Sequence, residues 1–136
     1  MDWKLELVVV PVADQDRAKA FYLDTFGFDL VVDHRGGPDF RVIQATPPGS
    51  ACSVALMHNP EAAGTLQGLH LVVQDIDAAH AELIGRGGEP AGIVHFVEGR
   101  QVDGPDPEGR DYNSFFEVHD PDGNGWLIQH VSGQNG

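Results

Sequence analysis

One histidine draws attention because it lies inside an apolar run. His70 is flanked by Leu69 and Leu71 in a segment that alternates like a β-strand. The reference pKa of an imidazole lies near neutrality, so a histidine held at a binding surface could act as a general acid or base. A histidine at such a position can also be a hydrogen-bonded core residue. The residues themselves leave both roles open.

A carboxylate and an aromatic ring share one face of a second predicted strand, residues 112–119. Alternation places Phe115 and Glu117 on one face, and the apolar Phe116 and Val118 on the other. The apolar face favours packing against a helix. The opposite face would then offer an aromatic wall and a carboxylate to a ligand, although Glu117 could equally be an ordinary solvated residue of the strand.

The remaining reactive side chains form no recognisable motif. The single cysteine, Cys52, lies in an apolar run without a neighbouring base, which favours a structural thiol over a nucleophile. It excludes an internal disulfide and fits a reducing compartment. Four further imidazoles stand near predicted strand ends, and a metal site combining one of them with His70 and Glu117 has no support from ligand spacing. These four are His58, His95, His119 and His130.

Length and charge limit the classes of function. The chain has 136 residues, which suits one domain, and a formal net charge of −13. Such a surface repels phosphate backbones, so we expect no nucleic-acid partner. No apolar run approaches the roughly 20 residues that span a bilayer, and Met1 is not followed by a signal-like segment. We therefore expect no membrane partner and a cytoplasmic location.

The first part of the chain predicts one strand, one helix and three more strands. Leu5–Pro11 is rich in β-branched residues and ends at a proline, which cannot donate to a strand ladder. Asp14 is typical of a helix N-cap, and Gly27 of a helix end. The following strands are predicted near Phe28–His34, Phe40–Thr46 and Ala51–His58.

The same order of signals begins again near Leu66. Adding 61 to the residue number maps Asp14 onto Asp75 and Gly27 onto Gly88, so a cap and a stop recur in order. The last strands correspond at an offset of about 73, which leaves about 12 extra residues in Gly99–Arg110. This segment predicts either an exposed connection or a lid over a pocket. The strands of the second half are predicted at Leu66–Val73 and near Ile93–Glu98, Tyr112–His119 and Gly125–Val131.

Three segments carry a family resemblance: Val12–Tyr22 with the following Phe26-Gly-Phe28, Leu71–Ala79, and the turn Asp120–Asn124. Together they resemble the glyoxalase / bleomycin-resistance / extradiol-dioxygenase superfamily, also called vicinal oxygen chelate proteins. The resemblance implies an α+β fold in which two tandem β-α-β-β-β modules form a cupped mixed sheet. It implies one domain over residues 1–132, with module one at about 1–60 and module two at about 65–132, and a flexible tail at 133–136.

Many members of this superfamily hold a divalent metal in the cup through four side chains. The corresponding positions here are Leu7, Gly68 and Leu127, with Val54 as the partner that the repeat assigns. None of these side chains offers an imidazole, carboxylate or thiolate. We therefore expect no metal at the usual site and no other cofactor. This argues against a standard glyoxalase I or extradiol dioxygenase.

The resemblance also indicates which side chains should face the cup. Residues two positions along a strand from the four usual ligand positions face the same way. Val9, Leu56, His70 and Gln129 are therefore also predicted to face the cup. His70 and Glu117 are the candidate catalytic residues. The predicted substrate-binding residues are Leu7, Val9, Val54, Leu56, Gly68, Phe115, Leu127 and Gln129.

Two functions of different classes fit these residues. The first is an enzyme, of the lyase or isomerase kind, that acts on a small oxygenated organic molecule with His70 as acid or base. The second is a metal-free protein that binds and sequesters a small molecule, as similarity to the bleomycin-resistance branch implies. An enzyme needs a positioned ionisable group in the cup, whereas a sequestering protein needs mainly apolar and aromatic walls. The resemblance further implies a homodimer.

Overall fold

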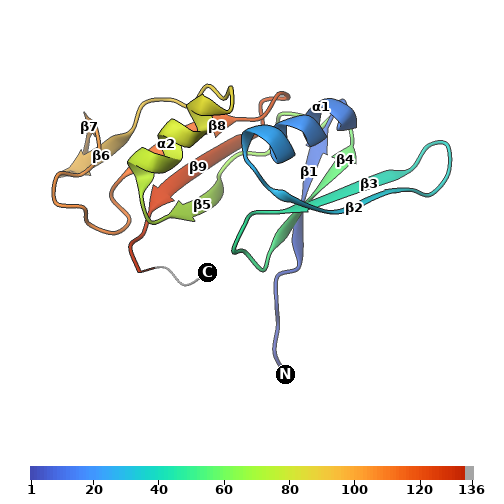
Figure 1. The fold of residues 1–136 in the computed structure, drawn as a ribbon, viewed down its shortest axis with the longest axis horizontal. Helices are drawn as coiled ribbons and strands as arrows, with labels where there is room; N and C mark the ends of the chain where they lie inside the picture. Colours follow the sequence, from blue (N-terminus) through green and yellow to red (C-terminus); the bar gives the residue numbers. More distant parts are fainter. Residues whose placement is uncertain (134–136) are drawn as a thin grey trace. The chain divides into compact units, whose positions relative to one another are not determined.

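The computed structural model describes residues 1–133, which fall into two compact units. Unit 1 consists of Met1–Leu66 and the turn Asp120–Asn124, and unit 2 contains Gln67–His119 and the chain from Gly125 onward. Each unit contains one sheet with a helix (Figure 1). The predicted α+β class and the two β-α-β-β-β modules are confirmed. The predicted tail at 133–136 lies outside the described residues from position 134.

Unit 1 is built on a four-stranded sheet with the strand order β1-β4-β3-β2. The outer strand β1 runs parallel to β4, and the other neighbours are antiparallel. The predicted first helix divides into an α-helical turn and a π-helical turn. The elements are β1 (Leu7–Val12), α1 (Gln15–Ala20), η1 (Phe21–Thr25), β2 (Asp29–Arg35), β3 (Arg41–Thr46) and β4 (Ser53–His58).

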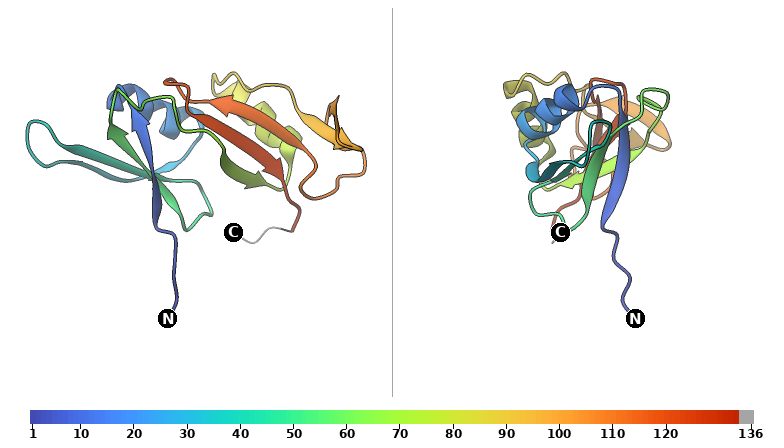
Figure 2. Two further views of the ribbon diagram at one scale, coloured as in Figure 1. Left: turned by 180° about the vertical axis from the view of Figure 1, so that it is seen from behind. Right: turned by 90° about the vertical axis from the view of Figure 1, so that its right-hand side faces the viewer.

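Unit 2 repeats this plan with one additional strand, in the order β5-β9-β8-β6-β7. The extra strand β7 lies in the segment for which no regular structure was predicted, and it forms a hairpin with β6 at the end of the sheet away from β5 (Figure 2). The elements are β5 (Leu69–Val73), α2 (Ile76–Gly85), β6 (Val94–Val97), β7 (Arg100–Asp103), β8 (Phe115–His119) and β9 (Gly125–His130).

Both helices begin as the sequence predicts. The Asp14 carboxylate accepts a hydrogen bond from the backbone N–H of Arg17, and Asp75 accepts one from Ala78, each at 3.0 Å. Each bond satisfies a backbone donor that the first helical turn leaves unpaired. The matching caps confirm the internal repeat at an offset of 61. Neither helix of the described chain is long and apolar enough to cross a membrane.

The sheet of unit 2 buries one face beneath α2. Phe116, Trp126 and Ile128 on this face are at most 4% exposed. His80 of α2 contacts the Phe116 ring edge to face, with ring centroids 4.9 Å apart. Apolar area removed from water stabilises this packing. Because side chains alternate along each strand, the opposite face carries the other set of residues and is the face available to a ligand.

The sheet of unit 1 shows that two predicted facings are wrong. In the parallel pair, Val54 lies opposite Val8, and Leu56 lies opposite Val10. Directly paired residues point to the same face. Val54 and Leu56, which are 4% and 0% exposed, therefore point to the buried face together with Val10, and away from Val9, which is 53% exposed.

The two facings were predicted wrongly because the predicted offset between the last strands of the two modules, about 73, is one residue too large. Val8 lies opposite Val54, and the equivalent Leu69 lies opposite Trp126, so the last strands correspond at an offset of 72. The residue equivalent to Leu127 is then Ala55. A slip of one residue exchanges the two faces of a strand.

Candidate functional site

The open face of the unit 2 sheet brings five predicted site residues together. In the first row across the strands, His70 of β5 lies opposite Leu127 of β9, which lies opposite Glu117 of β8. In the next row, Gln129 of β9 lies opposite Phe115 of β8. Residues paired in this way share a face. The facing predicted for all five side chains agrees with the strand register.

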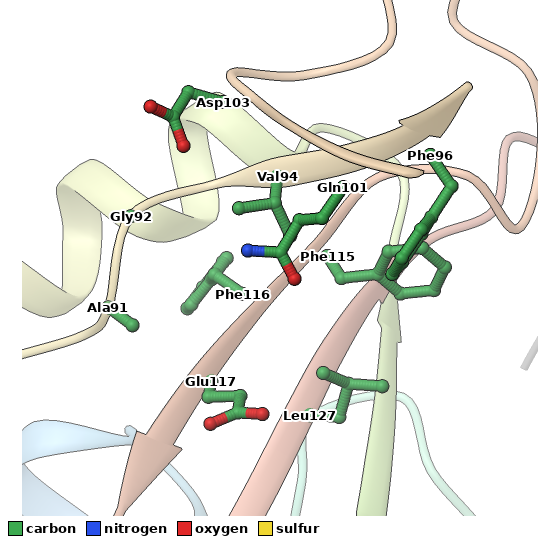
Figure 3. A pocket seen from close by; sticks show the side chains of 10 residues that line it. All are labelled: Ala91, Gly92, Val94, Phe96, Gln101, Asp103, Phe115, Phe116, Glu117 and Leu127. Carbon is green, nitrogen blue, oxygen red and sulfur yellow. The ribbon is translucent and has the colours of Figure 1, made fainter. Parts of the chain in front are cut away.

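A cleft of about 570 Å³ lies over this face at its β8–β6–β7 end (Figure 3). Its volume lies in the range of roughly 300–1,000 Å³ that is typical of small-molecule sites. Figure 3 shows the Phe96 and Phe115 rings together on one side, Glu117 and Leu127 on another, and the Gln101 amide between them. The full lining is Ala91, Gly92, Val94, Phe96, Gln101, Asp103, Phe115, Phe116, Glu117 and Leu127.

The aromatic wall has a defined geometry. The ring centroids of Phe96 and Phe115 are 5.8 Å apart and the rings are inclined at 68°, an edge-to-face contact. This contact fixes the angle between two apolar surfaces that a flat ligand ring could touch. Phe96 is 41% exposed and Phe115 is partly exposed. Both rings therefore retain surface that a ligand could cover.

The β6–β7 hairpin carries the part of the lining that the sequence did not identify. Val94 and Phe96 come from β6, and Gln101 and Asp103 from β7. The alternation of Val94 and Phe96, followed by the turn residues Glu98 and Gly99, is a hairpin signal that could have revealed this. Both turn residues have positive φ, 50° and 77°, as a tight two-residue hairpin turn requires.

Asn113 attaches this hairpin to the rest of unit 2. Its side chain accepts a hydrogen bond from the Phe96 N–H and donates one to the Phe96 carbonyl, both at 3.1 Å. The same amide also donates to the Asp106 carboxylate at 3.0 Å, and this bond is the main cause that lowers the pKa of Asp106. The predicted exposed connection or lid is thus a hairpin with a fixed base, followed by a loop organised around Asp106.

His70 lies in a second, smaller cleft of about 220 Å³ that shares Glu117 and Leu127 with the first. Its Nδ1 lies 2.6 Å from the Gly68 carbonyl oxygen. A carbonyl only accepts, so in the neutral imidazole Nδ1 carries the proton and Nε2 keeps a lone pair. Gly68, at φ 82°, adopts a conformation that favours glycine, and this turn presents its carbonyl to the ring.

The two candidate catalytic residues do not form a dyad. His70 and Glu117 lie on strands separated by β9, with Leu127 between them. Two strand spacings place their backbones roughly 10 Å apart. The two side chains could touch different parts of one ligand, but this spacing does not favour direct proton exchange between them.

The remaining predicted residues lie elsewhere. Gln129 shares the open face with Phe115 but lines neither cleft. Leu7 and Val9 belong to β1 in unit 1. Cys52 is half-buried immediately before β4, with its Sγ 3.6 Å from the Ser53 carbonyl oxygen.

The residues at the usual metal positions do not fit a metal. With the corrected register these positions are Leu7, Ala55, Gly68 and Leu127, and none of their side chains has a donor atom. Elsewhere in residues 1–133, no three histidine, cysteine or acidic side chains are grouped so that they could hold an ion. Leu7, Ala55 and Leu127 can therefore contact a ligand only through apolar surface, and Gly68 only through its backbone.

The fold and the site define the class of protein. The chain belongs to the Glyoxalase/Bleomycin resistance protein/Dioxygenase superfamily, whose model matches residues 4–128. The predicted resemblance is confirmed.

Individual relatives are similar over nearly the whole chain. An antibiotic-binding protein, TnmS3, from Streptomyces sp. CB03234 is 34% identical, with a TM-score of 0.75 and coverage of 96% of this chain and 98% of that protein. A glyoxalase/bleomycin resistance protein from the same organism is 33% identical, with a TM-score of 0.68 and coverage of 93% and 99%. The uncharacterized protein YetH of Bacillus subtilis (strain 168) is 26% identical over 125 residues, which are 90% of this chain and 93% of YetH.

Proposed function

We propose that this protein binds and sequesters a small organic molecule with a flat aromatic part, without a metal, in the cleft of unit 2. The observation that carries this proposal is the lining of the cleft. Phe96 and Phe115 form an aromatic wall, and Leu127 occupies a usual metal-ligand position with an apolar side chain. The 34% identity to an antibiotic-binding protein supports a role in binding.

A second candidate function rests on the environment of His70. The hydrogen bond to Gly68 orients the imidazole and leaves Nε2 as a possible base. In an enzyme that used this base, His70→Ala would lower turnover by roughly 10²–10⁴-fold and leave ligand affinity within about an order of magnitude. The separation of His70 from Glu117 by a whole strand favours the binding role. A sequestering protein would release its natural ligand chemically unchanged, which mass spectrometry of the extracted ligand would show.

Phe115→Ala tests the binding proposal. The probe is acridone, a neutral, flat and fluorescent tricycle, titrated against the purified protein. Burial of one phenylalanine side chain contributes about 1.5–3 kcal/mol, so we expect the substitution to weaken acridone binding by roughly 10- to 100-fold. Phe40→Ala is the matched control, because Phe40 is 48% exposed and belongs to unit 1. Equal affinities of the two variants, or no binding by the parent protein, would overturn the proposal.

We also expect a two-fold homodimer. Val9 of β1 and Val32 of β2 lie at the two ends of one row across the open face of the unit 1 sheet, and they are 53% and 37% exposed. Between them lie the buried Ala55 and the polar Gln44, so the exposed apolar surface is at the two ends of the row. Exposed valines at sheet edges favour association with a second copy. Light scattering at tens of micromolar should give twice the chain mass, and Val9→Lys should shift the protein toward monomer. Ile84→Lys on α2, 54% exposed, is the control. A monomeric parent protein would contradict the expectation.

A further inference from the structure

The cleft of unit 2 contains a carboxylate without a cation to neutralise it. Glu117 is exposed at the cleft, and among the described residues no lysine or arginine lines either this cleft or the smaller one beside it. Asp103 adds a second carboxylate to the lining. A cation that entered the cleft would therefore meet negative charge and no lysine or arginine among the described lining residues.

The charge of the surrounding unit has the same sign. The described residues of unit 2 contain ten aspartates and glutamates but three arginines. Two of these arginines are already paired with carboxylates: Arg86 with Glu82 at 2.7 Å, and Arg110 with Asp106 and Glu108. A cleft surrounded by an excess of one charge concentrates ligands of the opposite charge, and it does so most strongly at low ionic strength.

The aromatic wall lies within reach of the same ligand. Phe115 and Glu117 are two residues apart on one face of β8, which separates their backbones by roughly 7 Å. A flat fused-ring molecule can therefore lie against Phe115 while a substituent reaches the Glu117 carboxylate. The phenylalanine ring faces also attract positive charge. The Gln101 amide, between these residues in Figure 3, can donate to or accept from a polar substituent of the ligand.

From this geometry we infer that the ligand class is an aromatic amine that is protonated at neutral pH, with its ammonium or amidinium-like group on Glu117 and its ring against Phe115 and Phe96. This inference rests on the proposed binding function and names the chemistry of its ligand. The ring contacts supply binding that neutral and cationic aromatics share, and Glu117 supplies the preference for the cation.

Two tricyclic probes of matched shape separate these contributions. 9-Aminoacridine is a cation at neutral pH, and acridone is its neutral counterpart. In about 50 mM salt we expect the parent protein to bind 9-aminoacridine roughly tenfold more tightly than acridone, because a charge-assisted hydrogen bond adds to the shared stacking. Glu117→Gln should reduce this preference to about twofold or less, because the cationic probe loses the charge that distinguishes it from the neutral one. Raising the salt to about 500 mM should also reduce the preference.

Glu98→Gln is the matched control, because it removes the same charge from the hairpin turn outside the cleft lining. It should keep the preference for 9-aminoacridine. If Glu117→Gln and Glu98→Gln behave alike, or if the parent protein binds both probes equally, the inference about the ligand is overturned. The proposed function still stands in that case, provided that acridone binding depends on Phe115. If acridone shows no binding that depends on Phe115, the proposed function is overturned, and the inference that rests on it is overturned as well.

Discussion

Asn124→Ala should lower the free energy of unfolding by about 3–5 kcal/mol, because it removes several hydrogen bonds of one buried side chain at once. The Asn124 side chain is completely buried. Its Oδ1 accepts from the backbone N–H groups of Gly64 and Leu66 at 3.0 and 3.2 Å. Its Nδ2 donates to the Pro11 carbonyl and to the Asp120 carboxylate, both at 2.8 Å.

These bonds join the turn Asp120–Asn124 to Pro11 near the end of β1 and to the segment after β4, at Gly64 and Leu66. The bond to Asp120 is buried and the other three are part-buried, and a group that loses its partner away from water costs about 1–3 kcal/mol. Urea denaturation of the variant and the parent protein measures the loss.

The control for this prediction is Asn59→Ala. The Asn59 side chain is exposed and accepts from the Ala62 N–H at 3.3 Å. Its loss should cost less than about 1 kcal/mol, because water can replace an exposed partner. A comparable loss of stability in the two variants would show that the buried Asn124 bonds contribute little.

Leu56→Ala should destabilise the protein by about 2–5 kcal/mol and leave the affinity for acridone unchanged. Leu56 is fully buried on the central strand β4, where it lies opposite Val10 on β1 and Ile43 on β3. Both neighbours are also fully buried, so truncation leaves a cavity that the sheet can fill only in part. Thermal and urea melts measure the loss of stability.

Met57→Ala is the neighbouring control on the other face of the same strand. Met57 is only half-buried, so we expect a smaller loss, under about 1.5 kcal/mol. If Met57→Ala destabilised the protein more than Leu56→Ala, the strand would have the register that the sequence first indicated, with Leu56 on the open face of the unit 1 sheet.

The sequence by itself determined the elements with strong local signals. The caps Asp14 and Asp75 act through hydrogen bonds within three residues, so their identity and spacing suffice to place both helix starts. The facing of Glu117 was also predictable, because Glu117 and His119 alternate with the apolar Phe116 and Val118. The facing of His70 followed from the family resemblance, which places it two residues from Gly68. The same local information identified the internal repeat and the family.

The register of β4 was decided only by the tertiary structure. Val54, Ala55, Leu56 and Met57 are all apolar, so the sequence contains no alternation that distinguishes their two faces. The pairing of β4 with β1 and β3 settles which residues are buried. Likewise, β7 completes the cleft because it pairs with β6, and Phe96 contacts Phe115 across 19 positions of sequence. Contacts between residues distant in the chain depend on the packing of whole strands, which no local pattern specifies.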